Sequence, residues 1–530
     1  MINRISCTKH QIYGFGILVL VSIASAPAMG QLTVTSVEPA ARSLTAPVGS
    51  TVVVHFDRAL DPATVVDGSF WAFGRWSGTA TGVITLTDGD ATMVLTPDEP
   101  FFAGEQVMVI LSHDIEAADG SPLRAEGYSF QFWTRASPAD MNFSLIDTLT
   151  TQTTPGVDTI AYGGIASDVN GDGYSDITIV NEESADLRVF LNRADGTGLL
   201  HDFIKPTFPV NDRASPSEPA DFNHDGFVDI CVANINTATV SILLGNGDGT
   251  FGPQQEVSVG SDPRGIAVLD VDGDGDVDIV NTNFGSNNMS LLINDGSGVF
   301  GSATFFEGGG TGEWALAAVD MNEDGLLDLV TGARSSQRIL VNTNDGDGTF
   351  TFVSSTSSGG SVWMIACGDL NGDGHEDVTT ANSSSHNGAI LLGDGAGSLG
   401  APDTHPTDPF PIATDVGDLD GDGDLDWVTS SFSGNWFIFK NDGAGAFSFD
   451  QEIPSPEAAS CCLMTDLDND GDLDLALVDE IADVVILMDN VGSAAVPVTS
   501  TWGMIVMTLA LFVVATVLLK RRGAWHFLRA

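Results

Sequence analysis

The chain has 530 residues and is strongly acidic, with 72 Asp and Glu against 19 Lys and Arg and a formal net charge of -53. This charge excludes a nucleic-acid-binding surface, which must neutralise phosphates with basic side chains. Hydrophobic residues make up 43% of the chain, enough for folded cores, so the acidity indicates bound cations rather than disorder. The composition favours export to a calcium-rich, oxidising place.

Residues 1–30 are typical of a secretory signal peptide. Two basic residues precede an apolar run at residues 12–23, and small residues follow it. A basic start, a short apolar segment and a small-residue cleavage site are the features of such peptides. We expect the mature chain to begin between Met29 and Gln31.

Residues 31–136 predict a small β-sandwich. Short alternating apolar runs, separated by turn-forming residues, occupy residues 32–37, 51–56, 82–86, 92–95, 106–111 and 128–133. Period-two alternation in about a hundred residues is typical of a sandwich. The segments Val37-Glu-Pro39, Val54-His-Phe56 and Phe130-Gln-Phe132 resemble the bacterial Ig-like domain of S-layer proteins. That resemblance implies a spacer or a modest binding module, without catalysis.

Residues 137–142 form a polar linker, and residues 143–149 resemble a strand that a later repeat lacks. After Val484-Val-Ile-Leu-Met-Asp-Asn490 the last repeat has no final strand. We expect residues 143–149 to pair with that repeat, which would close a ring and leave no unpaired edge.

The stretch Asp270-Val-Asp-Gly-Asp-Gly-Asp-Val-Asp278 carries carboxylates at positions one, three, five and nine and a glycine at position six. Alternating oxygen ligands, with Gly275 permitting the sharp turn, predict a loop wrapped around a calcium ion. The seventh residue, Asp276, would contribute its backbone carbonyl.

The pattern D-x-[DN]-x-D-G-x-x-D occurs seven times, at steps of 48 to 53 residues. A fixed period near fifty, with the content of four strands per unit, predicts a propeller in which each repeat is a blade. Residues 143–491 therefore predict a seven-bladed β-propeller, and the whole chain an all-β fold with one C-terminal transmembrane helix.

The candidate metal ligands are the residues at positions one, three, five, seven and nine of each loop. They are Asp168, Asn170, Asp172, Tyr174, Asp176, Asp221, Asn223, Asp225, Phe227, Asp229, Asp270, Asp272, Asp274, Asp276, Asp278, Asp320, Asn322, Asp324, Leu326, Asp328, Asp369, Asn371, Asp373, His375, Asp377, Asp418, Asp420, Asp422, Asp424, Asp426, Asp466, Asp468, Asp470, Asp472 and Asp474. They would hold up to seven structural Ca2+ ions. Asparagine at position three in four loops lowers the charge, so we expect weaker binding there. His224 and His375, at positions four and seven, are interpreted as solvated.

The repeats resemble the FG-GAP or VCBS family of calcium-binding propellers, known from integrin α-chains and bacterial exported proteins, since loop and flanking strands match in every repeat. The resemblance implies that the loops lie on the face away from the ligand. The residue six before each loop would start the innermost strand on the opposite face. The candidate ligand face is therefore Tyr162, Arg264, Trp314 and Trp363, which could stack on sugar rings and hold a carboxylate. The alternative is that these aromatics pack between blades.

No motif of a known enzyme class is present, neither H-E-x-x-H nor G-x-S-x-G nor a P-loop. The favoured function is a non-catalytic adhesion or binding protein with an extracellular glycan or protein ligand. The alternative is a calcium-dependent polysaccharide lyase. Cys461 and Cys462 form either a vicinal disulfide or two buried thiols.

Residues 492–502 predict a linker with a sorting motif, residues 503–519 a transmembrane helix, and residues 520–530 a basic cytoplasmic tail. The segment Val496-Pro-Val-Thr499 before Trp502-Gly503 resembles the IPTL-CTERM surface-sorting tail. The resemblance implies a sorting protease, and the alternative is a plain membrane anchor. Both place the protein in the cell envelope or at the cell surface, anchored to the membrane at least transiently.

Overall fold

A computed structural model describes residues 30–66 and 68–492, and this part of the chain is all β, without helices. Within these ranges there is accordingly no helix long and apolar enough to cross a membrane. The expected signal peptide, sorting motif, transmembrane helix and basic tail fall outside the described residues, except at Gly30 and Gly492.

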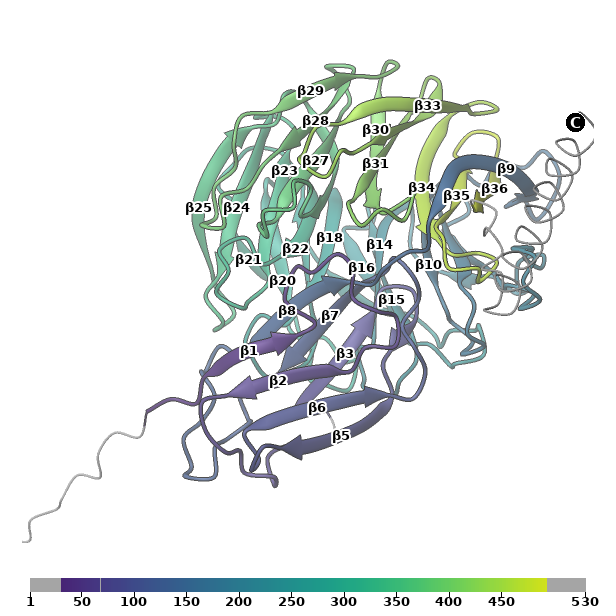
Figure 1. The fold of residues 1–530 in the computed structure, drawn as a ribbon. Helices are drawn as coiled ribbons and strands as arrows, with labels where there is room; N and C mark the ends of the chain where they lie inside the picture. Colours follow the sequence, from purple (N-terminus) through teal and green to yellow (C-terminus); the bar gives the residue numbers. More distant parts are fainter. Residues whose placement is uncertain (1–29, 67, 493–530) are drawn as a thin grey trace, which may run out of the picture.

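The N-terminal domain is a sandwich of two four-stranded sheets (Figure 1). One has the order β1 (Val34–Glu38), β2 (Val52–Phe56), β6 (Thr92–Pro97), β5 (Gly82–Thr87), and the other β4 (Gly78–Thr79), β3 (Phe70–Gly74), β7 (Gln106–Leu111), β8 (Tyr128–Trp133). Strands β3 and β4 were not predicted. Every residue of β3 is buried, because one face packs in the sandwich and the other on the next domain, so the alternation that marks a half-buried strand is absent.

Seven four-stranded antiparallel sheets make up the rest of the described chain, and we number them repeat sheets 1 to 7. Their strands, from the innermost outward, are β10 (Ala161–Ser167), β11 (Asp176–Asn181), β12 (Asp186–Phe190), β13 (Phe208–Pro209); β14 (Ala214–Ala220), β15 (Asp229–Asn234), β16 (Thr239–Leu243), β17 (Gln255–Ser258); β18 (Pro263–Leu269), β19 (Asp278–Asn283), β20 (Asn288–Leu292), β21 (Thr304–Phe306); β22 (Glu313–Val319), β23 (Asp328–Ala333), β24 (Arg338–Asn344), β25 (Phe350–Ser357); β26 (Val362–Gly368), β27 (Asp377–Asn382), β28 (Asn387–Leu391), β29 (Asp403–Pro406); β30 (Pro411–Gly417), β31 (Asp426–Ser431), β32 (Asn435–Lys440), β33 (Ser448–Pro454); and β34 (Ala459–Thr465), β35 (Asp474–Asp479), β36 (Val484–Gly492), β9 (Ala139–Thr150).

The seven sheets stand around a common centre in a propeller-like ring (Figure 1). Each innermost strand contacts the innermost strand of the next sheet, and β34 of sheet 7 contacts β10 of sheet 1. The second strands, such as β19, are buried at every residue because a neighbouring sheet covers each face.

Strand β9 completes repeat sheet 7 by pairing with β36, from Val484 opposite Thr150 to Gly492 opposite Ala139. The expected pairing of residues 143–149 with the last repeat is confirmed. The expected linker over residues 137–142 is wrong over residues 139–142, because β9 and its ladder already include Ala139. Residues far apart in sequence thus share one sheet, and the ring has no missing strand there.

Buried asparagines connect neighbouring repeat sheets. Five of them donate from Nδ2 to a backbone carbonyl in the loop of the preceding sheet at 2.7–3.1 Å: Asn192, Asn294, Asn344, Asn441 and Asn490. Repeat sheets 2 and 5 have Gly245 and Gly393 at the corresponding place. These five asparagines are therefore bridges between neighbouring sheets.

The sandwich lies on the end of the ring that carries the acidic loops (Figure 1). The sandwich and the segment from Ser137 to Ala139 together make a hydrogen bond to every loop: Asp168 N to Trp76 O at 2.7 Å, Thr79 Oγ1 to Asp221 Oδ2 at 2.8 Å, Trp71 Nε1 to Gly275 O at 2.9 Å, Ser129 N to Gly325 O at 2.8 Å, Arg42 Nε to Gly374 O at 2.7 Å, Ala139 N to Asp420 O at 3.1 Å and Ser137 N to Gly471 O at 2.6 Å. The Ig-like domain therefore covers the loop end of the ring, where the family resemblance implied only a spacer or binding module.

Candidate functional site

The seven acidic loops share one backbone conformation. In each, Oδ2 of the first Asp accepts a hydrogen bond from the N–H of the sixth residue, a glycine, at 2.8–3.1 Å. The turn requires a left-handed residue at this glycine, and Gly275 has φ +96°. The loops therefore fold around their first carboxylate, as the pattern predicts.

The ninth Asp of each loop fixes the loop to its own sheet. In sheet 3, Asp278 Oδ2 accepts from Val271 N at 3.1 Å and Oδ1 from Asn294 N at 2.8 Å, and the same pair of bonds occurs in all seven sheets. Burial raises the pKa of these carboxyls, to about 7 in Asp377 and to about 9 in Asp474, although the N–H donors oppose the shift.

The residue at position three divides the loops into two classes. Where it is Asn, in sheets 1, 2, 4 and 5, its Nδ2 donates to the Asp at position five at 2.9–3.0 Å. Where it is Asp, in sheets 3, 6 and 7, that hydrogen bond cannot form, because a carboxylate has no N–H to donate. In the Asn loops, the side chains at positions three and five therefore attract each other, whereas in the Asp loops two carboxylates at these positions repel each other.

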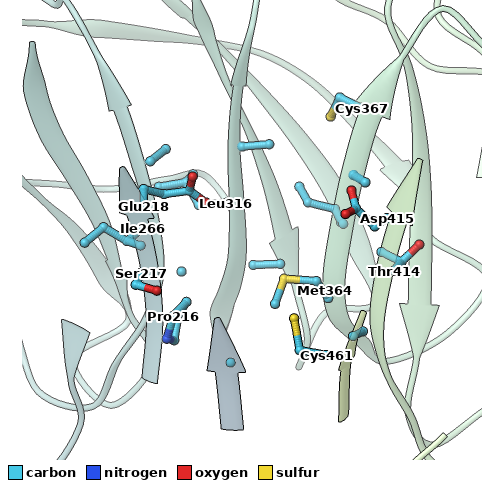
Figure 2. Close-up of a pocket in the computed structure, with 18 of the residues that line it drawn as sticks. Pro216, Ser217, Glu218, Ile266, Leu316, Met364, Cys367, Thr414, Asp415 and Cys461 are labelled. Atoms are coloured by element: carbon cyan, nitrogen blue, oxygen red, sulfur yellow. The ribbon is translucent and has the colours of Figure 1, made fainter. Parts of the chain in front are cut away.

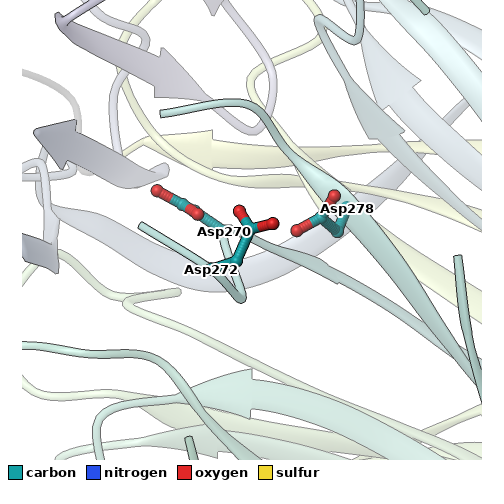
Figure 3. Close-up of side chains that lie close together, drawn as sticks. All are labelled: Asp270, Asp272 and Asp278. Atoms are coloured by element: carbon teal, nitrogen blue, oxygen red, sulfur yellow. The ribbon is translucent and has the colours of Figure 1, made fainter. Parts of the chain in front are cut away.

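In each of the three Asp loops, carboxylates at positions one, three and nine converge. One oxygen from each of Asp270, Asp272 and Asp278 lies within 4.8 Å of the others (Figure 3), and the same holds for Asp418, Asp420 and Asp426 and for Asp466, Asp468 and Asp474. The same loops hold buried carboxylate oxygens without a hydrogen-bond donor, on Asp272, Asp418, Asp424 and Asp472. Convergent oxygens without donors fit a hard divalent cation such as Ca2+.

Both loop histidines bond a neighbouring loop; the side chain of His224 is only 21% exposed, contrary to the sequence interpretation, whereas that of His375 is 34% exposed. His224, at position four of loop 2, bonds Asp276 Oδ1 of loop 3 at 2.7 Å and lies edge-on to Trp71. His375, at position seven of loop 5, bonds Glu323 of loop 4. A side chain at position four reaches position seven of the neighbouring loop, so these pairs connect adjacent sheets.

At the end of the ring away from the loops, a pocket of about 300 Å³ opens. Its lining contains all four residues of the predicted ligand face, Tyr162, Arg264, Trp314 and Trp363, together with other aromatic and charged side chains. No residue of the Ig-like domain lines it. We call this pocket the mouth.

The tryptophans of the mouth are covered by guanidinium groups. Arg264 lies over the ring of Trp314 at 4.2 Å, and Arg334 lies 4.3 Å from the Trp314 ring centre and 4.4 Å from that of Trp363. Trp363 also donates to the hydroxyl of Tyr162 at 2.6 Å. Trp314 is only 5% exposed, so the expected stacking of a sugar on its ring is not available. The mouth presents arginines supported by aromatic rings.

Among the mouth arginines, Arg334 lacks a carboxylate partner. Arg213 pairs with Glu182 at 3.1 Å and Arg264 with Asp262 at 2.8 Å, whereas Arg334 forms no ion pair with any described residue. Burial and the neighbouring Arg264 lower the pKa of Arg334. The sequence analysis missed Arg334, because this residue lies in the turn between β23 and β24 and not at the start of an innermost strand.

The interior of the ring holds a cavity of about 240 Å³ between the mouth and the Ig-like domain. Two carboxylates face it from different sheets, Glu218 of β14 and Asp415 of β30 (Figure 2). Arg75 of the Ig-like domain approaches Glu218 at 3.9 Å. Both acids lie three residues before a loop, where the other five repeats have Ile, Ala or Leu. Aligning the repeats at that position would have found them.

The cysteines of the described residues are free thiols, including Cys461, which lines the cavity, and Cys462. The vicinal disulfide considered from the sequence is therefore not formed here. Burial, together with Asp415, raises the pKa of Cys461 to about 12, so this thiol is not a nucleophile at neutral pH.

Three solved structures illustrate what the chain is similar to. An Agrocybe aegerita lectin that recognises non-reducing terminal N-acetylglucosamine is 20% identical at a TM-score of 0.40, over 64% of this chain and 88% of the lectin. Virginiamycin B lyase from Staphylococcus aureus is 13% identical at a TM-score of 0.44, over 66% of this chain and 99% of the lyase chain. Kuenenia stuttgartiensis hydrazine synthase is 14% identical at a TM-score of 0.46, over 65% of this chain and 98% of the synthase chain. None of these similarities bears on function, and no curated protein sequence matches.

Family comparisons give a firmer result. Bacterial Ig-like domains match residues 28–134, and FG-GAP-like repeats match residues 168–232, 221–281, 270–331, 320–380, 369–429 and 418–477. Each repeat match runs from one loop past the next, so six matches include seven loops. The matched residues 168–477 are more than half of the chain, and the protein therefore belongs to the FG-GAP-like repeat family, with a bacterial Ig-like domain before its repeats.

Proposed function

We propose that this protein is an exported cell-surface protein whose loops bind structural Ca2+ and whose mouth binds an extracellular acidic glycan, without catalysis. The unpaired guanidinium of Arg334, held against Trp314 and Trp363, is the observation that carries the proposal. A guanidinium lying on an aromatic face keeps its N–H donors in the plane of the group, where a carboxylate can accept two of them.

The surroundings of Arg334 suit a sugar acid better than a small inorganic anion. Phe410 and Phe432 also line the mouth and supply apolar surface for the faces of sugar rings, while Trp363 is partly exposed. Glu182 is already occupied by Arg213, and Asp262 by Arg264, so the arginine left for a ligand is Arg334. A glycan that carries uronic acids offers both a carboxylate and apolar ring faces.

The test is isothermal titration of trigalacturonate in the presence of calcium. Replacing Arg334 by Ala removes a charged hydrogen bond, which contributes about 1.5–3 kcal/mol, so the affinity falls by roughly 10- to 150-fold. Arg338→Ala is the matched control, because Arg338 is exposed on the same sheet. Equal affinities in wild type and Arg334→Ala would refute the proposed site. Binding of a protein ligand that the same variant abolishes would assign the mouth to a protein instead.

A polysaccharide lyase is the second candidate. Lyases release unsaturated products that absorb in the ultraviolet, so incubation with polygalacturonate at several pH values separates the two candidates directly. A steady rise in absorbance that Arg334→Ala abolishes would make the protein an enzyme. A constant absorbance with retained binding supports the adhesion or ligand-binding role.

The cellular location is proposed from the sequence. The chain is exported by its N-terminal signal, and residues 503–519 hold it in the membrane until a sorting protease acts at the preceding motif. Mass spectrometry of the mature protein tests this, since cleavage removes the C-terminal residues, whereas a chain that still ends at Ala530 would indicate a plain anchor.

A further inference from the structure

The side chain of Lys440 contacts the carboxylates of acidic loop 6 from the strand that follows it. Lys440, the last residue of β32, contacts a carboxylate oxygen of Asp420 and lies 3.6 Å from Asp422. These are positions three and five of loop 6, and the side chain of Asp420 is only 9% exposed. The ammonium group therefore sits among the oxygens that a cation in this loop would contact.

The place of Lys440 can be identified in every repeat sheet, because the next residue donates its N–H to the ninth Asp of the loop. The seven corresponding residues are Leu191, Leu244, Ile293, Thr343, Leu392, Lys440 and Asp489. Five of them are uncharged. Sheet 6 alone has a cation at this place, and sheet 7 alone has an anion.

The two charged residues hold the same position relative to their loops. In sheet 7, Asp489 precedes Asn490, whose N–H donates to Asp474 at 2.8 Å, just as Lys440 precedes Asn441, whose N–H donates to Asp426 at 2.9 Å. Lys440 in sheet 6 is close to Asp420, which corresponds to Asp468. Loop 7 therefore gains one negative charge beyond its own carboxylates, whereas loop 6 gains one positive charge.

From these contacts we propose that Lys440 is a built-in counter-ion that replaces calcium in loop 6, so that divalent cations are held firmly only by loops 3 and 7. Loop 3 has Ile293 at this place, so its carboxylates have no positive side chain there. In loop 7, Asp489 adds attraction for a cation. The four Asn loops already join positions three and five by a hydrogen bond. Blades of one ring thus differ in their dependence on metal.

A lysine differs from calcium in what it can satisfy. Its ammonium group forms ion pairs with Asp420 and Asp422, but Asp418 Oδ1 and Asp424 Oδ1 keep no donor. Oxygens of Asp418, Asp420 and Asp426 still lie within 4.8 Å of one another, so the loop retains the shape of a metal site. Removing the ammonium should therefore convert loop 6 into a calcium loop, because a divalent cation no longer meets a positive charge beside Asp420.

The test is a count of bound calcium. Wild type, Lys440→Leu and the control Arg338→Leu are equilibrated at micromolar free Ca2+, desalted, and analysed by inductively coupled plasma mass spectrometry. Leucine is the residue that sheets 1, 2 and 5 have at this place. We expect about two ions per chain in wild type and in the control, and about three in Lys440→Leu. Lys440→Met, which keeps the length of the side chain, serves if the leucine variant does not fold.

Titration calorimetry provides a second measurement, in which Lys440→Leu gains a site that binds on the order of tenfold more tightly than the weak sites of wild type. Asp489→Leu should weaken one of the two tight sites. Equal numbers and affinities in wild type and both Lys440 variants would overturn the role of Lys440. This inference rests on calcium binding by the loops, and an absence of calcium from all variants would overturn that proposal as well, while leaving binding at the mouth to its own test.

Discussion

The bridge made by Asn294 allows a sharp prediction about what holds neighbouring sheets together. This side chain is 3% exposed, and its Nδ2 donates to Phe222 O at 2.8 Å in loop 2 and to Val277 O at 3.1 Å in loop 3. Replacing it by Ala removes both hydrogen bonds and leaves two buried carbonyls without this donor. Each net hydrogen bond contributes about 1 kcal/mol and each unsatisfied buried group costs about 1–3 kcal/mol, so we expect Asn294→Ala to lower the free energy of unfolding by about 2–4 kcal/mol.

The matched control is Asn246→Ala. Asn246 is exposed and donates only to Thr250 Oγ1 within its own turn, so its loss should change stability by less than about 0.5 kcal/mol. Guanidinium unfolding in the presence of calcium measures both variants. Because a ring of repeats can unfold in parts, hydrogen exchange is measured as well. We expect faster exchange in residues 221–229 and 270–278, but not in residues 418–426. Indistinguishable unfolding of the two variants would show that the bridge contributes nothing.

Three further predictions concern the loops, the domain contact and the mouth. Chelating calcium with EGTA should lower the melting temperature. An ion at ten times its dissociation constant contributes about 1.4 kcal/mol to the free energy of unfolding, and two sites contribute about 3 kcal/mol. An unchanged melting temperature would contradict structural binding. Gly273→Ala should weaken docking of the Ig-like domain, because the new Cβ would lie 2.5 Å from the carbonyl carbon of Glu126. Limited proteolysis at the domain junction measures this docking. An unchanged cleavage pattern would count against a tight contact. Burial and Glu182 raise the pKa of Glu480 from 4.5 to about 8, so its stabilising effect is complete below pH 4.5 and lost as the pH rises through 8; Glu480→Gln should therefore gain melting temperature relative to wild type between pH 5 and pH 9, and parallel curves would argue against this titration.

The Asp pattern could be read from sequence because it is local. Nine consecutive residues contain the candidate ligands, the turn glycine and the ninth Asp, which fixes the loop to its own sheet. Spacing alone therefore predicts the conformation of the loop around Asp270 and Gly275. The closing strand was also predictable, since the last repeat lacks a strand that residues 143–149 supply. Strand β3 was not, because burial on both faces removes the alternation on which the prediction relies.

The sequence by itself determined the repeat, the acidic loops and the register that brings Trp314 and Trp363 to one end of the ring, because all of these follow from short-range spacing. Only the tertiary structure decided that Arg334 stacks on those rings, that Glu218 and Asp415 face one cavity, and that Lys440 enters loop 6. These contacts join different strands, sheets or domains. Their geometry depends on how the sheets pack around the centre, which no local pattern of residues specifies.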